Sequence, residues 1–155
     1  MKSIIILLVL CLLPLSGKTT ESEVREFLAT YSEKMNAKEV FRVNEMHAGH
    51  CSFVSVGKAR KGLQLFGTKG TMHLSKLRTA FADLDLYGFH IQPEHIQIMD
   101  GEICAVVIAK VQENVAKKGE APKIYFYDYI LFMVREEEQL KLMQAVMQPT
   151  QAPSP

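Results

Sequence analysis

The chain has 155 residues, carries 18 basic and 17 acidic side chains for a net charge of +1, and is 48% hydrophobic. This length and composition are typical of one globular domain and exclude a disordered chain. The balanced charge argues against a nucleic-acid-binding protein, because such proteins usually carry a clustered basic surface. We therefore expect one folded domain that does not bind nucleic acid.

The N-terminal residues 1–17 have the pattern of a secretory signal peptide. Lys2 precedes an uncharged apolar stretch from Ile4 to Leu15, and the small residues Ser16 and Gly17 follow it. In a helix this stretch would cover about 18 Å, less than the roughly 30 Å hydrocarbon core of a bilayer. We expect cleavage after Gly17, a secreted, extracellular protein, and no membrane association after cleavage.

Cleavage would remove Cys11 and leave Cys51 and Cys104. A cysteine pair in an oxidising compartment can form a disulfide. Both residues also lie in strand-like segments, where a free thiol behaves as a small buried apolar group. The sequence leaves both states open.

Apolar residues with a helical period predict helices in the first half of the chain. Residues 21–35 carry them at i, i+3, i+4, i+7 and i+11, which indicates one buried helical face. Residues 38–47 predict a second, shorter helix with His47 on its inner face. Leu74, Leu77, Phe81 and Leu84 predict a third helix.

Strand patterns dominate the remainder of the chain. Asp100 and Gly101 predict a two-residue hairpin turn, and residues 136–139 predict a turn between the last two strands. Residues 149–155 predict a short disordered tail that contains proline. Helices followed by a run of strands favour an α+β fold with helices on one face of an antiparallel sheet. The expected strands cover residues 50–56, 63–66, 86–99, 102–115, 124–135 and 140–148.

This order of elements resembles the nuclear transport factor 2-like superfamily, which includes the SnoaL-like and ketosteroid isomerase-like proteins. The similarity extends from Val24 to Gln148, within an expected domain of residues 18–148. It is clearest in FLATYSEKMNAKEVFRVNEMHAGHCSFVS, residues 27–55, and in the last strand, LKLMQAVMQ. The resemblance implies a cone-shaped domain in which a strongly curved antiparallel sheet wraps the N-terminal helices and leaves a cavity. It also implies binding of small apolar molecules, catalysis on them, or homodimerisation through the sheet.

The resemblance places the catalytic positions of the ketosteroid isomerase-like proteins on three residues of this chain. Tyr31 matches the tyrosine that donates to an oxyanion, whereas Ser55 stands where those enzymes have a carboxylate base, and Ile130 stands where they have a second acid. Asp128 lies two residues before Ile130 and shares its face of the strand. Because a serine without an activating base cannot abstract a proton, we expect no catalysis; Tyr31 and Asp128 remain the candidate catalytic residues.

The expected ligand site combines these residues with apolar neighbours. We expect neither a cofactor nor a metal site, because His47, His50 and Cys51 span the change from helix to strand and should diverge. The tyrosines of residues 125–129 alternate along one strand; if their face is outward it predicts a homodimer interface, and if inward it lines the cavity. The expected ligand-binding residues are Tyr31, Met35, His47, Phe53, Ser55, Phe81, Phe126 and Asp128.

Three functions remain open from the sequence. The first is a secreted domain that binds a small apolar ligand or a partner. The second is an isomerase, dehydratase or cyclase that acts on a small apolar substrate in the same cavity. The third is a dimeric structural or interaction protein whose cavity is filled by side chains such as methionine, which packs well into irregular gaps.

Overall fold

The computed structural model describes residues 18–56, 64–69 and 78–150. The expected signal peptide, residues 1–17, and the last part of the expected tail, residues 151–155, lie outside these ranges. Within the described residues, no helix combines the length and the hydropathy that a membrane span requires.

Two helices open the domain, as the sequence predicts. α1 (Glu21–Asn36) begins at Thr20, whose hydroxyl accepts a hydrogen bond from the amide of Glu23 at 3.2 Å and so caps the helix. α2 (Val40–Glu45) is shorter than expected, so that His47 begins a strand instead of ending a helix. Residues 78–82 form one helical turn; the earlier part of the expected third helix lies outside the described residues.

In the described part of the chain, six strands form one sheet in the order β2-β1-β6-β5-β4-β3. The sheet is mixed because β1 pairs with β6 in parallel, whereas we expected antiparallel pairs throughout. β1 and β6 are not joined by a hairpin, so no tight turn forces them to run in opposite directions. The strands are β1 (His47–Ser55), β2 (Gln64–Lys69), β3 (Leu84–Ile98), β4 (Ile103–Lys117), β5 (Lys123–Glu136) and β6 (Gln139–Thr150).

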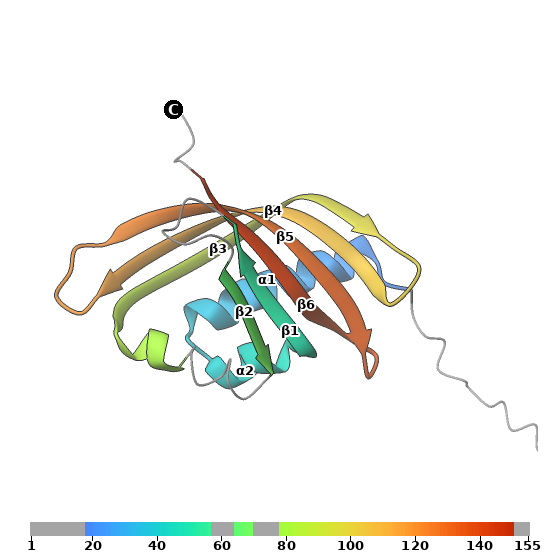
Figure 1. Cartoon of the computed structure of the whole chain (residues 1–155), viewed down its shortest axis with the longest axis horizontal. Helices are drawn as coiled ribbons and strands as arrows, with labels where there is room; N and C mark the ends of the chain where they lie inside the picture. Colours follow the sequence, from blue (N-terminus) through green and yellow to red (C-terminus); the bar gives the residue numbers. More distant parts are fainter. Residues whose placement is uncertain (1–17, 57–63, 70–77, 151–155) are drawn as a thin grey trace, which may run out of the picture.

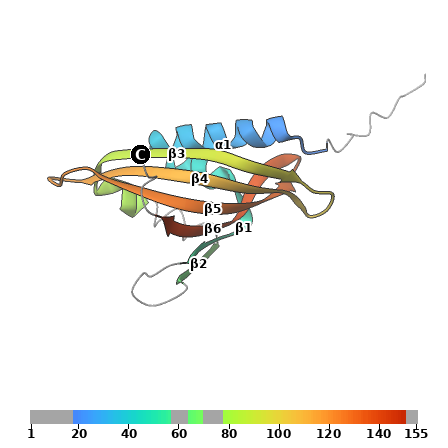
Figure 2. The same ribbon diagram turned by 90° about the horizontal axis from the view of Figure 1, so that it is seen from above.

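The α+β cone fold is confirmed: the long strands bend over α1, which packs along one face of the sheet (Figures 1 and 2). Strand alternation explains which face is inner. On β4, Val107 and Ala109 are fully buried, whereas Ile108 between them is 42% exposed. β6 reaches Thr150, so the expected tail begins later than residue 149.

The turn predicted at Asp100 and Gly101 is found between β3 and β4, but its loop has four residues instead of two. Residues 99–102 connect β3 to β4, and only Gly101 among them has a positive φ, of 153°. The tight turn joins β5 to β6 at Glu137 and Glu138, whose φ angles are 50° and 62°. Positive φ at both central residues defines a type I′ turn, which favours asparagine and glycine.

Replacing these residues by the preferred pair, Glu137→Asn with Glu138→Gly, is expected to stabilise the protein by about 0.5–1 kcal/mol, because glutamate is strained at positive φ. Urea denaturation followed by circular dichroism measures the change. Glu102→Asn is the control, because it removes an exposed acid at a position without positive φ. Equal stability of the turn variant and the wild type would show that the turn carries no strain.

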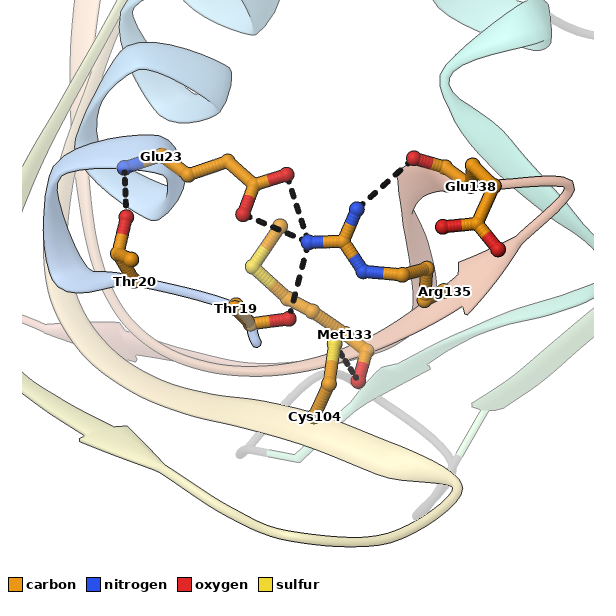
Figure 3. Close-up of polar contacts among 7 residues, drawn as sticks. All are labelled: Thr19, Thr20, Glu23, Cys104, Met133, Arg135 and Glu138. Carbon is orange, nitrogen blue, oxygen red and sulfur yellow. Dashed lines mark hydrogen bonds and ion pairs between the residues drawn. The ribbon is translucent and has the colours of Figure 1, made fainter. Parts of the chain in front are cut away.

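An arginine fastens the start of α1 to the β5–β6 hairpin (Figure 3). Arg135 Nη2 lies 2.6 Å from Glu23 Oε2 and 3.2 Å from Thr19 Oγ1, and its Nη1 donates to the carbonyl oxygen of Glu138 at 2.8 Å. The Glu23 carboxylate raises the pKa of Arg135 further. These contacts hold the start of α1 in place over the sheet, and so help to fix the distance between the helix and the sheet.

Both described cysteines are free and buried. Cys51 lies on β1 and Cys104 on β4, and β6 and β5 separate these strands. Neighbouring strands are about 4.8 Å apart, so the two residues lie far beyond the roughly 7 Å between Cα atoms that a disulfide permits. Burial raises the pKa of the Cys51 thiol to about 12, which keeps it protonated and unreactive.

Candidate functional site: an apolar cavity with one carboxylate

A cavity of about 280 Å³ lies between α1, the turn at residues 78–82 and the inner face of the sheet. Its volume is close to the lower end of the range for ligand sites, roughly 300 Å³. Its walls are mainly aliphatic and aromatic. The lining residues are Phe27, Leu28, Tyr31, Met35, Phe53, Ala80, Phe81, Leu84, Tyr87, Phe89, Ile91, Glu113, Tyr129, Leu131, Leu142, Ala145 and Met147.

Four of the eight expected ligand-site residues line this cavity. Tyr31 and Met35 come from α1, Phe53 from β1, and Phe81 from the turn at residues 78–82. They meet there because the inner face of α1 and the sheet bury their apolar side chains together. The described side chains leave the cavity open, which argues against the hypothesis that methionine and phenylalanine fill it.

His47 lies behind Tyr31 and is not part of the cavity wall. The Tyr31 hydroxyl and His47 Nε2 are 3.0 Å apart in a buried hydrogen bond whose donor depends on the histidine tautomer. The His47 ring also contacts Phe53, with ring centroids 5.4 Å apart. Burial raises the pKa of Tyr31 above its ordinary value, so its hydroxyl stays neutral. This pair therefore orients the Tyr31 ring at the wall of the cavity.

Asp128 and Phe126 lie on the other side of the sheet, so their expected place in the cavity is wrong. Asp128 Oδ1 forms an ion pair with Lys110 Nζ at 2.5 Å, on the solvent-exposed outer face. Phe126 borders a separate hollow together with Lys110. Both faces of β5 are apolar, and the sequence therefore could not decide which one is inner. The tyrosine face of β5 is the inner one: Tyr129 is 7% exposed and Leu131 3%.

Ser55 ends β1, where its backbone pairs with Met147 of β6 and Gln64 of β2. Its side chain lies outside the described part of the structure. Among the described residues, no group of three histidine, cysteine or acidic side chains is arranged to hold a metal ion.

The sequence analysis missed Glu113, which is the one charged residue among the described residues that line the cavity. Tyr87 Oη donates a hydrogen bond to Glu113 Oε1 at 3.1 Å. Burial raises the pKa of Glu113, while the hydrogen bonds from Tyr87 and Tyr127 oppose this change. Glu113 shares the inner face of β4 with Val107, Ala109 and Val111, and this alternation was the available signal.

The negative charge of Glu113 acts on the tyrosines around it. The pKa of Tyr87 and that of Tyr129 are raised, first by burial and then by the nearby Glu113 carboxylate. The pKa of Tyr127 rises to about 12 for the same two reasons. All three hydroxyls therefore stay protonated at neutral pH. The site offers one carboxylate, several neutral hydroxyl groups and a large aromatic surface.

Comparison with solved structures identifies the class of fold. A scytalone dehydratase-like protein from Novosphingobium aromaticivorans is 15% identical, with a TM-score of 0.70 over 84% of this chain and 83% of that one. A ketosteroid isomerase-like protein from Erwinia carotovora atroseptica is 8% identical, with a TM-score of 0.64 over 84% and 96%. A hexachlorocyclohexane dehydrochlorinase from Novosphingobium barchaimii is 7% identical, with a TM-score of 0.66 over 84% and 86%.

The chain therefore has the same cone fold as these proteins, at sequence identities of 7–15%. No family model and no curated protein matches its sequence. At these identities the comparison establishes the fold alone, because one fold hosts many functions. The function has to be argued from the cavity of this chain.

Proposed function

We propose that this chain is a secreted protein that binds one small, largely apolar molecule in the cavity between α1 and the sheet. The observation that carries this proposal is the cavity itself, about 280 Å³ and lined mainly by apolar side chains. An engineered apolar cavity of roughly 150 Å³ already holds benzene. The signal-peptide pattern of residues 1–17 supports secretion.

Indole is a suitable first probe because the chain contains no tryptophan, so that the fluorescence of indole is not obscured. We expect its emission to shift to shorter wavelength when it enters the apolar cavity of the wild-type protein. Ala145→Phe should weaken this binding by at least roughly tenfold, because Ala145 is fully buried, lines the cavity and lies beside Phe53 and Leu131.

Gln144→Phe is the matched control, because Gln144 is the neighbouring residue on the same strand and is absent from the cavity wall. It should bind indole as the wild type does. Binding that survives Ala145→Phe would place the probe outside the cavity. No binding by the wild type, together with a bare mass in native mass spectrometry of the secreted protein, would overturn the proposal.

A second candidate function is catalysis in the same cavity, and the position of Glu113 favours it. A carboxylate with a raised pKa in an apolar site is suited to general acid–base chemistry. The expected base position, Ser55, therefore does not by itself exclude an enzyme. If denaturation releases a ligand from the purified protein, that ligand can be incubated with fresh protein to test for catalysis. Turnover that is lost in Glu113→Gln, while the variant still binds the ligand, would support an isomerase or lyase.

We also propose a homodimer through the outer face of the sheet. Ile108 of β4 and Ile130 of β5 are cross-strand neighbours, and they are 42% and 40% exposed. Ile130 in turn pairs with Val146 of β6, so that the three side chains form an apolar row across the outer face. A second copy of the chain would cover this row.

Ile130→Glu is expected to convert this dimer into a monomer, because a charge would be buried at its centre. Light scattering after size-exclusion chromatography measures the mass. Phe41→Glu is the control, since Phe41 is 59% exposed on α2 and lies away from the sheet. A monomeric wild type at high concentration would contradict the dimer, as would a dimer that Ile130→Glu leaves intact.

A further inference from the structure

Among the described residues that line the cavity, no basic side chain balances the charge of Glu113. None of the described residues that line the cavity is lysine, arginine or histidine. The contacts of the carboxylate are hydrogen bonds from the neutral hydroxyls of Tyr87 and Tyr127. Such hydrogen bonds lower the cost of burying a carboxylate but leave its charge in place.

Aromatic rings surround the same space. Tyr31 and Phe89 meet edge to face with ring centroids 6.0 Å apart, and the ring centroids of Phe81 and Tyr87 are 5.1 Å apart. The faces of aromatic rings attract cations, and more strongly where water is excluded. The aromatic residues of the wall are Phe27, Tyr31, Phe53, Phe81, Tyr87, Phe89 and Tyr129.

A half-buried carboxylate beside an aromatic wall is complementary to an organic cation. We propose that the ligand is a small amine, bound as its ammonium form, whose nitrogen pairs with Glu113 and whose apolar body packs against the aromatic rings. This inference rests on the proposed function, because it names the chemical class of the molecule that the cavity holds. A neutral ligand of the same shape would fill the apolar space and leave the carboxylate without a counter-charge.

The size of the cavity limits the amine. At about 280 Å³ the cavity suits an amine with one aromatic ring or a short alkyl chain, and it is too small for a peptide. The hydroxyls of Tyr87 and Tyr127 already donate to Glu113, so the ammonium N–H groups would use acceptor positions that remain on the carboxylate oxygens. One cationic group and one apolar body therefore satisfy the described site.

Two probes of nearly equal shape test the inference: 2-phenylethylamine, which is cationic at neutral pH, and 2-phenylethanol, which is neutral. Isothermal titration calorimetry measures both affinities on the full secreted chain. We expect the wild type to bind the amine at least roughly tenfold more tightly than the alcohol. Glu113→Gln should remove this preference while alcohol binding persists. Glu94→Gln, which removes an exposed carboxylate near Lys110, should keep it.

The outcomes distinguish failure of the amine inference from failure of the proposed binding function. If the wild type binds indole and 2-phenylethanol as tightly as the amine, the amine inference is wrong and the binding function stands. If the preference for the amine survives in Glu113→Gln, the nitrogen pairs with another group and the inference is also wrong. If none of the three probes binds, the proposed function fails together with the inference. Circular dichroism melts check that both glutamate variants are folded.

Discussion

Replacing Met133 by alanine is expected to lower the free energy of unfolding by about 3 kcal/mol. Met133 is fully buried on the inner face of β5, and it is the largest of the fully buried side chains of the described structure. Its neighbours in the sheet are Ala105 of β4 and Leu142 of β6, and strand pairing holds both of them in place. They cannot collapse into the space that the truncation leaves, so the protein loses both apolar burial and packing contacts.

Urea denaturation followed by circular dichroism measures this loss, and a thermal melt should show a decrease of about 10 °C for a domain of this size. Ile124→Ala is the matched control, because Ile124 lies on the same strand, is 54% exposed, and lies outside the apolar row of the proposed dimer. It should cost less than about 1 kcal/mol. Equal losses for the two variants would contradict the assignment of inner and outer faces. Protein concentration is kept constant, because a dimer would also contribute to stability.

The sequence was sufficient to predict those elements whose residue pattern has one clear periodicity. Val24, Leu28, Tyr31 and Met35 recur at helical spacing and are the buried residues of α1. Thr20, a residue type favoured at the N-cap, begins this helix. The wall that Tyr31 and Met35 form was therefore predictable from the chain alone.

The sequence was insufficient where both alternatives were chemically plausible. On β5, apolar residues occupy both faces, so the alternation could not show whether Asp128 or Tyr129 points inward; the packing of α1 decides this. The two-residue turn was placed at Asp100–Gly101 because its residues are the preferred ones. The two-residue turn lies at Glu137 and Glu138, within the turn predicted at residues 136–139, where Arg135 and strand pairing hold an unfavourable backbone. In both cases, tertiary contacts override a local preference.

Glu113 was missed for a different reason. The resemblance to ketosteroid isomerase-like proteins points to the positions of Tyr31, Ser55 and Ile130, and Glu113 occupies none of these three. The alternation along β4 indicates that Glu113 faces inward. It follows three buried apolar residues on the same face of the strand, Val107, Ala109 and Val111. An acid on the buried face of a strand usually has a structural or functional reason to be there.

Glu113→Gln is expected to stabilise the ligand-free protein at neutral pH by about 1 kcal/mol, because glutamine fills the same space without a buried charge. Glutamine also keeps an oxygen that can accept the hydrogen bond from Tyr87. Because burial is the largest cause of the raised pKa of Glu113, the folded protein favours the protonated carboxyl group more than the unfolded chain does.

The direction of the pH dependence follows from this difference. At pH values below the ordinary glutamate pKa, both folded and unfolded chains hold the proton, and the wild type should be nearly as stable as Glu113→Gln. As the pH rises toward the raised folded-state pKa, the unfolded chain releases its proton first, so the wild type loses stability relative to the variant. Above the folded-state pKa the loss is complete and the difference stays constant.

Urea denaturation of both proteins between pH 4 and pH 8 tests this, with Glu94→Gln as a control in which an exposed carboxylate is neutralised. The difference in unfolding free energy between Glu113→Gln and the wild type should grow with pH, whereas that of the control should not. A Glu113→Gln protein that is less stable than the wild type at neutral pH would show that the tyrosine hydroxyls fully compensate the buried charge. The carboxylate would then be a structural partner of Tyr87 and Tyr127, and there would be no electrostatic reason to expect a cationic ligand beside it. The same series therefore measures whether the empty cavity carries an unmet electrostatic cost, which is the physical basis for expecting a cation there.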